Sequence, residues 1–507
     1  MKKLFKSTAK FDARAVEMGI GELVLQENAA RAVADLIREK IAPGGEVIAL
    51  CGGGNNGADA LAAVRMLAGD FECKAILTRE LAEGSNAAKQ AQIAKKTGVK
   101  IISNLNYNSN LNALFADANC VIDGIFGSGL RGELDSKLKS LVAAANEAHA
   151  LKIAVDFPSG LNASGQIMGA CFKADFTITM GARKIGLYGD FAKDFVGEII
   201  CAPLGLAEDV FASESEDFLL EWSDLELPSR AAQNVNKGDF GHAFVLAGAM
   251  SGAAQMCALA ALNMGAGRVS VVGEISNLNP QIMHKSNFGV ASAVALGMGL
   301  GNLNLTLQDG KAALCDGSTD APLDPSKVTS PATRTEFSDS NLKLSQIYPE
   351  LASVPCVVDA DMFGRGEVLN FASRADVVLT PHPKEFASLL NVAGLGKFEI
   401  SEIVRRKFEL ARLFSQNFPA TLVLKGANTI IARAGTLYVC PLGSNKLAVG
   451  GSGDVLAGII LAYLAQGFAP LSSAINGVIA HAKTAVNYGG AAFSFTPKDM
   501  IGGLKWL

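Results

Sequence analysis

The stretch "EVIALCGGGNNGADALAAVRMLAG" (residues 46–69) decides the fold class of the first part of the chain. Residues 46–52 form an apolar run typical of a buried strand, and residues 58–69 show the spacing of apolar side chains expected of a helix. A strand that leads through a glycine-rich loop into a helix is the repeating unit of a parallel α/β sheet. Backbone N–H groups at the start of such a helix favour an anion such as phosphate, and a merely tight turn is the alternative.

More runs of the same kind follow this stretch. Near-continuous apolar strands separated by helices imply a parallel sheet that is covered on both faces. The expected strands are 73–78, 120–127, 152–160 and 176–181, and a further helical pattern covers 31–41.

The pattern breaks between residues 207 and 238, which are acidic, then rich in proline and polar residues, and lack a clear strand. We place a domain boundary there, near residue 215, which predicts two α/β domains, 1–215 and 216–507. No sequence repeat relates the two parts. The second series of expected strands is 241–248, 268–273, 291–297, 355–361, 376–383, 421–426 and 428–441, the last a hairpin that turns at 433–435.

Composition excludes several classes of protein. A net charge of −4 over 507 residues argues against a general nucleic-acid or membrane-surface role. The first residues lack the continuous apolar segment of a signal peptide, and the most apolar run, 455–464, is too short to span a bilayer. Nine cysteines without a CxxC pair indicate buried thiols in a reducing compartment. We therefore expect a soluble cytoplasmic protein.

Polar side chains follow two other expected strands of the first domain. Asp123 begins "DGIFGSGLRGE", and Asp156 and Ser159 lie in "VDFPSGLN". In open α/β sheets, ligands bind outside the carboxyl ends of the strands, so these residues and the first glycine loop should face one ligand. Asn56, Asp123 and Ser159 could supply oxygen ligands to a hard cation.

A second glycine loop, "GGSGDVLAG" (450–458), opens a helix in the second domain. Its amides could hold a transferring phosphoryl group while Asp454 acts as general base towards the reacting hydroxyl. The alternative is a plain turn in which Asp454 is only a favourable acid in the first helical turn.

Further features of the second domain favour the first of these interpretations. "KGANT" (425–429) offers Lys425, backbone amides and Thr429 to a nucleotide phosphate, and "VVDAD" places Asp359 and Asp361 at a strand end. His382 lies in the proline-framed "TPHPKE", although a lone histidine is more often structural. Glycine-rich segments also follow strands at 248–256 and 297–302.

"GGGNNGAD", "DGIFGSGLRG" and "VDFPSGLNA" resemble the N-terminal epimerase domain of the YjeF family, over most of residues 1–210. The resemblance implies a Rossmann-like three-layer α/β/α domain, a potassium ion held by Asn56, Asp123 and Ser159, and proton transfer by Asp156. Ala58 and Ala60 replace glycines of the family loop, which should leave function intact with slightly less room at the backbone. The implied substrate residues are Asn55, Asn56, Gly57, Ala58, Asp59, Gly127, Ser128, Gly129, Leu130, Arg131, Gly132, Glu133 and Asp156.

The second domain resembles the C-terminal dehydratase domain of the same family, which is ribokinase-like, over about 280 residues. "LPSR", "NKGDFG", "NMGAGRVSV", "DAD", "TPHPKEF", "LKGANT" and "GGSGDVLAG" occur in the family order. The departures are Asn236 for histidine, Met298 for proline, Lys384 for glycine and Ser452 for threonine. The resemblance implies substrate contacts by Ala253, Gly299, His382 and Asp454, and nucleotide contacts by Lys425, Gly426, Ala427, Asn428, Thr429 and Gly453.

Taken together, the two resemblances imply repair of the hydrated cofactors NADHX and NADPHX. The first domain would interconvert the R and S forms, and the second would dehydrate the S form with ADP and magnesium. The partners would be these small molecules, with no nucleic acid or membrane. The sequence leaves three questions open: whether ADP or ATP is preferred, whether NADHX or NADPHX is preferred, and whether the protein is a homo-oligomer or a monomer.

Two rival functions remain as well. One is a small-molecule kinase with a regulatory first domain, since "GGSGD" fits both chemistries. The other is a first domain that only binds nucleotide or serves as a scaffold.

Overall fold

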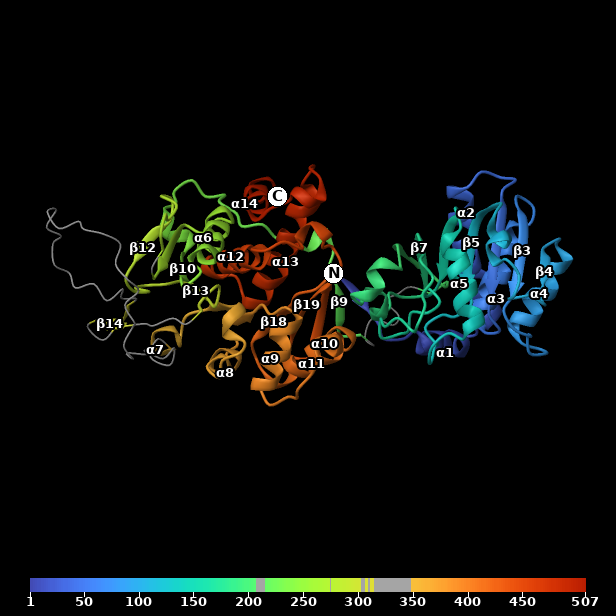
Figure 1. Ribbon diagram of the computed structural model, residues 1–507, viewed down its shortest axis with the longest axis horizontal. Helices are drawn as coiled ribbons and strands as arrows, with labels where there is room; N and C mark the ends of the chain where they lie inside the picture. Colours follow the sequence, from blue (N-terminus) through green and yellow to red (C-terminus); the bar gives the residue numbers. More distant parts are fainter. Residues whose placement is uncertain (207–214, 274, 302–305, 309–310, 314–347) are drawn as a thin grey trace. The chain divides into compact units, whose positions relative to one another are not determined.

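The computed structural model describes residues 1–206, 215–273, 275–301, 306–308, 311–313 and 348–507. These residues form two compact units, Lys2–Leu219 and Leu220–Leu507 (the latter with Met1). Each unit is built around its own sheet, as Figure 1 shows.

The sheet of the N-terminal unit has seven parallel strands. The chain passes from β2 outward to β3 and β4, and then returns to place β5 on the other side of β2, so the strand order reverses between β2 and β5. The order across the sheet is β4 (Lys100–Ile102), β3 (Glu72–Leu77), β2 (Glu46–Cys51), β5 (Ala118–Gly124), β6 (Leu151–Val155), β7 (Phe176–Met180) and β8 (Glu198–Ala202). Apart from this sheet, β1 (Lys2–Leu4) pairs antiparallel with β9 (Asp217–Leu219).

Helices cover both faces of this sheet, because the strands are apolar on both sides. Val47 and Ala49 of β2 pack with one helical layer, and Ile48 and Leu50 pack with the other. The first layer is α2 (Glu22–Lys40), α3 (Asn55–Leu67) and α4 (Asn86–Lys96), and the second is α5 (Ser136–Glu147) with the 3₁₀ turn η1 (Leu111–Phe115). The unit also holds α1 (Ala9–Glu17), η2 (Ile185–Tyr188) and η3 (Phe191–Asp194). The expected three-layer α/β/α arrangement is confirmed.

The sheet of the C-terminal unit is parallel from β18 to β12, and the antiparallel hairpin β19–β20 lies beside β18. Ala434 and Gly435 form its turn with positive φ angles of 49° and 81°, at the place predicted for the hairpin. The order is β20 (Thr436–Cys440), β19 (Thr429–Arg433), β18 (Thr421–Leu424), β17 (Val377–Leu379), β16 (Cys356–Val358), β13 (Ala293–Leu296), β10 (His242–Leu246), β11 (Arg268–Val272) and β12 (Met283–Lys285).

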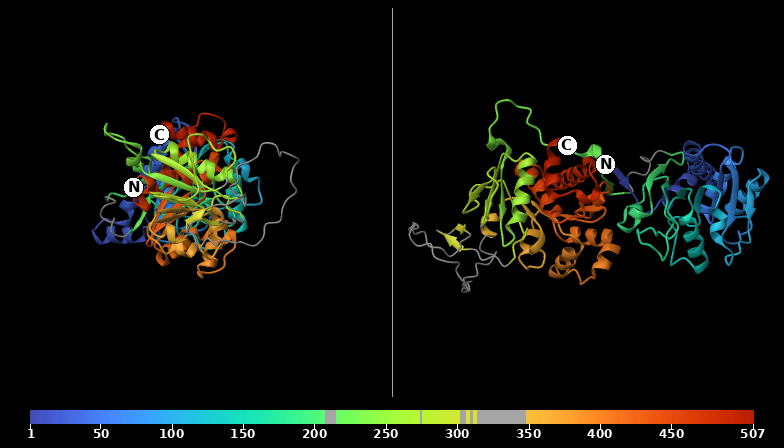
Figure 2. Two further views of the ribbon diagram at one scale, coloured as in Figure 1. Left: turned by 90° about the vertical axis from the view of Figure 1, so that its left-hand side faces the viewer. Right: turned by 45° about the horizontal axis from the view of Figure 1, so that its top comes forward.

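Helices again cover both faces. α12 packs against α6 and α13 over one face, as both ribbon views show, and α8 and α11 pack on the opposite face (Figures 1 and 2). The first group is α6 (Ser251–Asn263), α12 (Ser452–Ala465), α13 (Pro470–Asn487) and α14 (Pro497–Gly503), and the second is α8 (Val368–Ala372), α9 (Pro383–Val392), α10 (Ile400–Arg405) and α11 (Lys407–Asn417). Shorter elements are η5 (Trp222–Asp224), η6 (Lys237–Phe240), β14 (Thr306–Gln308), β15 (Lys311–Ala313), α7 (Tyr348–Leu351), η8 (Ala360–Met362), η9 (Asn445–Leu447), η10 (Ala492–Ser494) and η11 (Leu504–Trp506).

The predicted α/β class and every predicted strand are confirmed, and the differences concern short or polar segments. The region 207–238, expected to lack a strand, contains β9, and the helix expected at 31–41 begins at Glu22. The eight cysteines within the described ranges are free, and seven of them are buried, as expected. Among the described residues, no helix is both long enough and apolar enough to cross a membrane.

Candidate functional sites

A cavity of about 1250 Å³ lies in the N-terminal unit beside the point where its strand order reverses. Its wall is formed by the segments that follow β2, β3, β5 and β6, as expected for the carboxyl edge of an open sheet. Of the predicted substrate residues, Asn55, Asn56, Asp59, Gly127, Ser128, Gly129 and Asp156 line the cavity. The others, Gly57, Ala58, Leu130, Arg131, Gly132 and Glu133, are not part of its wall.

The glycine loop after β2 is held by close backbone contacts. A side chain at Gly57 would place its Cβ 1.9 Å from the carbonyl oxygen of Gly52, so only glycine fits there. Gly54 precedes the first residue of α3, and its carbonyl accepts the N–H of Ala58 at 3.1 Å. This tight turn brings Asn55 and Asn56 to the cavity at the positive end of the helix dipole.

Asp123 and Ser159 meet beneath the cavity. Both are fully buried; the backbone N–H of Ser159 donates to Oδ2 of Asp123 at 2.6 Å, and the Ser159 hydroxyl donates to Oδ1 at 2.6 Å. The N–H of Ile125 also donates to Oδ1, at 3.2 Å. Burial raises the pKa of the Asp123 carboxyl to about 6, and these hydrogen bonds oppose the rise. These contacts join the ends of β5 and β6; Asn56 lines the cavity, whereas Asp123 and Ser159 do not, and the predicted cation site stays a prediction.

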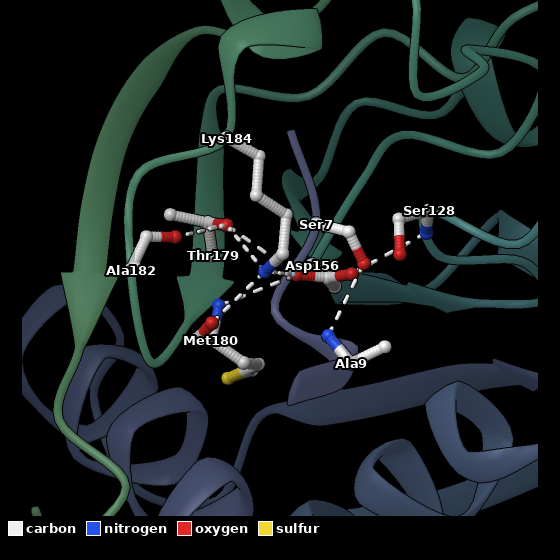
Figure 3. Close-up of polar contacts among 8 residues, drawn as sticks. All are labelled: Ser7, Ala9, Ser128, Asp156, Thr179, Met180, Ala182 and Lys184. Carbon is white, nitrogen blue, oxygen red and sulfur yellow. Dashed lines mark hydrogen bonds and ion pairs between the residues drawn. The ribbon is translucent and has the colours of Figure 1, made fainter. Parts of the chain in front are cut away.

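Asp156 follows β6 and is the centre of a polar network (Figure 3). Its Oδ1 accepts hydrogen bonds from Nζ of Lys184 at 2.5 Å and from the N–H of Met180 at 3.3 Å. Its Oδ2 accepts the N–H of Ser128 at 3.3 Å. The backbone of Asp156 has φ = 65°, a left-handed conformation that costs a residue with a Cβ about 1–2 kcal/mol. Such strain in a cavity wall is typical of functional positions.

Two more carboxyl groups, Asp12 and Asp59, line the same cavity. Burial raises the pKa of Asp59 well above its ordinary value, and the nearby carboxylates of Asp156 and Asp12 raise it further. Oδ1 of Asp59 is buried without a hydrogen-bond partner. Burial likewise raises the pKa of Asp12. Asp59 can thus be a neutral acid while Asp156 is paired with a lysine.

The second candidate site lies at the start of α12. Asp454 is in its first turn, after Gly451, whose φ of 89° requires a residue without a Cβ. Nζ of Lys425 lies 2.8 Å from Oδ1 of Asp359 and 3.7 Å from Oε2 of Glu385. Burial raises the pKa of Asp454 to about 6, assisted by the charge of Asp359 and opposed by that of Lys425. A general base of this kind would be ionised at neutral pH.

Other predicted residues of the second domain are placed around this helix start. A Cβ added at Gly453 would lie 3.3 Å from Nζ of Lys425, so the two motifs "KGANT" and "GGSGD" meet. Ala253 and Gly299 are also neighbours, because a Cβ at Gly299 would lie 3.4 Å from that of Ala253. Of the remaining nucleotide residues, Gly426, Ala427 and Asn428 follow β18, and Thr429 begins β19.

His382 has a structural role in the described geometry. Its Nδ1 accepts the N–H of Glu385 at 3.3 Å and caps α9, while a carboxylate oxygen of Glu385 accepts the N–H of His382. Burial and the charge of Asp359 raise the pKa of Glu385, and Lys425 opposes the rise. His382 therefore holds the helix that carries Glu385 to the site, and its predicted substrate contact stays a prediction.

Sequence reasoning missed three residues of these sites. Lys184 lies in "GARKIGL", where nothing in the pattern separates it from a surface lysine. Glu385 was quoted within "TPHPKE" without a role. Nε2 of His481 lies 3.1 Å from the hydroxyl of Ser452, and burial lowers the pKa of His481 to about 4. Within the described residues, no three His, Cys, Asp or Glu side chains are grouped as a metal site.

Comparison with known proteins gives one consistent result. Residues 22–186 match the family described as YjeF-related protein N-terminus, and residues 342–499 match the family described as NAD(P)H-hydrate dehydratase. The bifunctional NAD(P)H-hydrate repair enzyme of Helicobacter pylori is 38% identical over all of both chains. The chain belongs to the bifunctional NAD(P)H-hydrate repair enzyme family. The family's enzyme from Coxiella burnetii is 32% identical over 93% of this chain and 91% of its own.

A solved structure is similar to the C-terminal part alone. It is the ADP/ATP-dependent NAD(P)H-hydrate dehydratase of Bacillus subtilis, co-crystallised with ATP and Mg²⁺. The two chains are 23% identical, the match covers 55% of this chain and 92% of the other, and the TM-score is 0.41.

The departures from the repair-enzyme motifs lie where the fold can accept them. Ala58 and Ala60 are fully buried, and their methyl groups pack into the core between α3 and the sheet instead of narrowing the cavity. Met298 is also fully buried, whereas Lys384 is exposed in the first turn of α9. Ser452 keeps the hydroxyl of the threonine that it replaces and places it against His481.

Proposed function

We propose that this chain repairs hydrated nicotinamide cofactors with two active sites, one in residues 1–215 and one in residues 216–507. The observation that carries the proposal is that each compact unit has its own glycine loop with a buried or paired aspartate beside it, Asp156 in one and Asp454 in the other. Membership of the repair-enzyme family supports the same division of activities.

The first site interconverts the R and S forms of NADHX and NADPHX. A cavity of about 1250 Å³ has room for a dinucleotide, since drug-sized ligands occupy about 300–1,000 Å³. Epimerisation at C6 of the ring requires the hydroxyl to leave and to return on the other face. Asp156 shuttles the proton that the hydroxyl takes up to leave as water and that the water adding to the other face gives back, and the glycine loops at 52–54 and 127–129 contact the substrate.

Asn56, Asp123 and Ser159 are the residues that would hold a potassium ion. One observation fits a cation: the carboxylate of Asp123 is fully buried, and among the described residues no lysine or arginine pairs with it. Carboxylate, amide and hydroxyl oxygens suit a hard cation. The bound ion would supply the positive charge that keeps this carboxylate ionised and its two strand-end loops together.

The second site dehydrates the S form with ADP, giving AMP, phosphate and NAD(P)H. Hydroxide is a poor leaving group, so the C6 hydroxyl is first phosphorylated: Asp454 takes its proton, and the oxygen attacks the terminal phosphorus of ADP. The lone pair of the ring nitrogen then expels phosphate, and loss of a proton from the neighbouring C5 restores the double bond of NAD(P)H. Backbone amides of Gly450–Gly453 stabilise the moving phosphoryl group, and Lys425–Thr429 contact the nucleotide.

Asp359 and Glu385 are the carboxylates that would hold magnesium with the nucleotide. With Asp454 they place three carboxyl groups around the single ammonium of Lys425, and the raised pKa values of Asp454 and Glu385 fit a site that gains from added positive charge. Magnesium is commonly bound by one or two carboxylates together with substrate phosphates. It would neutralise charge on the phosphates during transfer.

One assay tests both halves of the proposal. The full-length protein is incubated with mixed R and S NADHX, ADP and magnesium, and the return of reduced-nicotinamide absorbance is followed. Complete recovery is expected, because epimerisation feeds dehydration; recovery of only the S fraction would contradict the epimerase. Parallel reactions with ATP in place of ADP, and with NADPHX in place of NADHX, determine the nucleotide and substrate preferences. No recovery with either nucleotide, together with ATP-driven phosphorylation of a vitamin-like alcohol, would establish the kinase alternative.

A further inference from the structure

Lys184 lies behind the wall of the epimerase cavity, where its side chain is 1% exposed and contacts Asp156, which lines the cavity. Its ammonium group donates to Oδ1 of Asp156 at 2.5 Å, to the carbonyl of Met180 at 2.9 Å and to the hydroxyl of Thr179 at 3.2 Å. An ammonium has three protons, so these contacts use all of its donors. Lys184 therefore cannot also bind a ligand in the cavity.

The two oxygens of Asp156 have different surroundings. Oδ1 accepts from Lys184, from the N–H of Met180 and from the hydroxyl of Thr179, all of which belong to the segment 179–184. Among the hydrogen bonds of the described residues, Oδ2 accepts the weak N–H contact of Ser128, and a Cβ at Gly127 would lie 3.1 Å from it. Figure 3 shows Asp156 with Lys184 on one side and Ser128 on the other. One oxygen is thus fixed to the protein, and the other lies against the glycine loop of the cavity.

The backbone alone would not keep Asp156 in this orientation. Its positive φ is a conformation that residues other than glycine rarely adopt, so contacts of the side chain must maintain it. Three carboxyl groups interact electrostatically within this network, Asp12 on α1, Glu22 on α2 and Asp59 on α3, and Lys184 opposes the effect of their charges on Asp12 and Asp59. Lys184 is the cation that offsets their repulsion of the Asp156 carboxylate.

We propose that Lys184 is a positioning residue of the epimerase, which holds Oδ1 of Asp156 so that Oδ2 faces the reacting ring carbon. The inference rests on the proposed epimerase function and adds a residue to it. A displacement of a catalytic group by about 1 Å can cost on the order of 10²-fold in rate. Loss of Lys184 should therefore lower turnover far more than substrate binding, because the cavity wall itself remains.

The test compares Lys184→Met, a neutral side chain of similar length, with the wild type in conversion of R-NADHX to the S form. We expect kcat to fall by about 10–100-fold while KM changes less than about threefold. Lys152→Met is the matched control, because within the described residues the ammonium of Lys152 donates to the carbonyls of Ala148 and Ala150 and not to Asp156. Thermal unfolding of each variant reports whether the N-terminal unit is folded, and dehydration of pure S-NADHX reports the amount of intact chain.

A double-mutant cycle with Asp156→Asn separates positioning from general destabilisation. If Lys184 acts through Asp156, the double variant loses no more activity than Asp156→Asn alone, whereas independent effects would multiply. Multiplied losses, or a kcat of Lys184→Met within twofold of the wild type, would overturn the proposal.

Thr179→Val keeps the ion pair and removes one hydroxyl, so it decides the question if Lys184→Met does not fold. It should lower kcat by several-fold, with KM unchanged; an unchanged kcat would overturn the proposal. A wild type that does not convert R-NADHX at all would instead contradict the proposed epimerase itself.

Discussion

The ammonium group of Lys425 lies 2.8 Å from Oδ1 of Asp359, although 66 residues separate them in the chain. Asp359 follows β16 and Lys425 follows β18, two strands that both flank β17, so the parallel sheet brings their ends together. Burial lowers the pKa of Lys425, but the carboxylates of Asp359 and Glu385 outweigh it and the pKa is raised overall. Lys425 is therefore a paired cation, and a nucleotide bound as proposed would have to share it with its carboxylate partners.

Asp454→Asn tests the proposed base of the dehydratase. The change keeps the size of the side chain and removes its ability to accept a proton, and general-base catalysis is typically worth about 10²–10⁴-fold. Turnover of S-NADHX should fall by about that factor, while ADP binding measured by calorimetry persists. Epimerisation should be unchanged, since Asp156 belongs to the other unit. Near wild-type turnover would contradict the general-base role and leave Asp454 as only a favourable acid in the first turn of α12.

The pH dependence of the dehydratase follows from the raised pKa of Asp454, about 6. A general base works in its ionised form, so kcat/KM for S-NADHX should rise with pH through this value and level off above it. For a general acid, kcat/KM would instead fall as the pH rises through the pKa. A pH–rate profile at low substrate, with the protein checked for folding at each pH, measures the midpoint. A rate that is flat between pH 5 and pH 8 would contradict the assignment.

The fold was predictable because its main strands are apolar on both faces, a pattern that survives without tertiary information. The strands that were not predicted are short, or lie at the edge of a sheet. Residues 198–202 and 283–285 are partly or wholly exposed, so they lack the continuous apolar run, and β9 at 217–219 has only three residues. Helix α2 extends to Glu22 because tertiary packing orders a stretch whose amphipathic pattern begins later.

The candidate sites were predictable where glycines and strand-end aspartates mark them in the sequence. Asp123 and Ser159 lie together because they follow neighbouring parallel strands, and Lys425 after β18 lies beside Gly453 at the start of α12. Lys184 was not predictable, because its role depends on the path of the chain after β7, which returns the side chain to Asp156. A buried lysine can be recognised only when its exposure is known.

Lys425→Met tests the electrostatic role of the Lys425 cation. Its removal leaves Asp359, which is buried, without a positive partner, and breaking a buried pair typically destabilises a protein by about 3–5 kcal/mol. Since Lys425 lowers the pKa of Asp454, the acid limb of the dehydratase profile should move to higher pH. Denaturant unfolding and the pH–rate profile of the variant measure the two effects. An unmoved acid limb in a folded variant would contradict the coupling.

Separate expression tests the independence of the two units. Residues 1–219 and 220–507 should each fold, because each carries its own sheet and core, and the first piece keeps β1 paired with β9. The second piece should clear only S-NADHX, and adding the first should restore clearance of the R form. Clearance of both epimers at similar rates by the second piece alone would contradict the division of labour.

Potassium dependence tests the role of Asp123. Its folded pKa of about 6 lies above the ordinary 3.8, so the folded state binds the proton more tightly than the unfolded chain does. Without a bound cation, the contribution of Asp123 to the free energy of unfolding should therefore be highest below pH 4. It should fall as the pH rises through 6, by roughly 3 kcal/mol at 1.36 kcal/mol per pKa unit.

A potassium ion would offset this loss only when the carboxylate is ionised. The thermal midpoint of the full chain should therefore rise with potassium at pH 8, relative to a tetramethylammonium salt at equal ionic strength, and rise little at pH 5. Asp123→Ala should abolish the difference and weaken epimerisation, while dehydration of pure S-NADHX continues. Equal loss of both activities would indicate a folding defect, and potassium stabilisation that persists in Asp123→Ala would place the ion elsewhere.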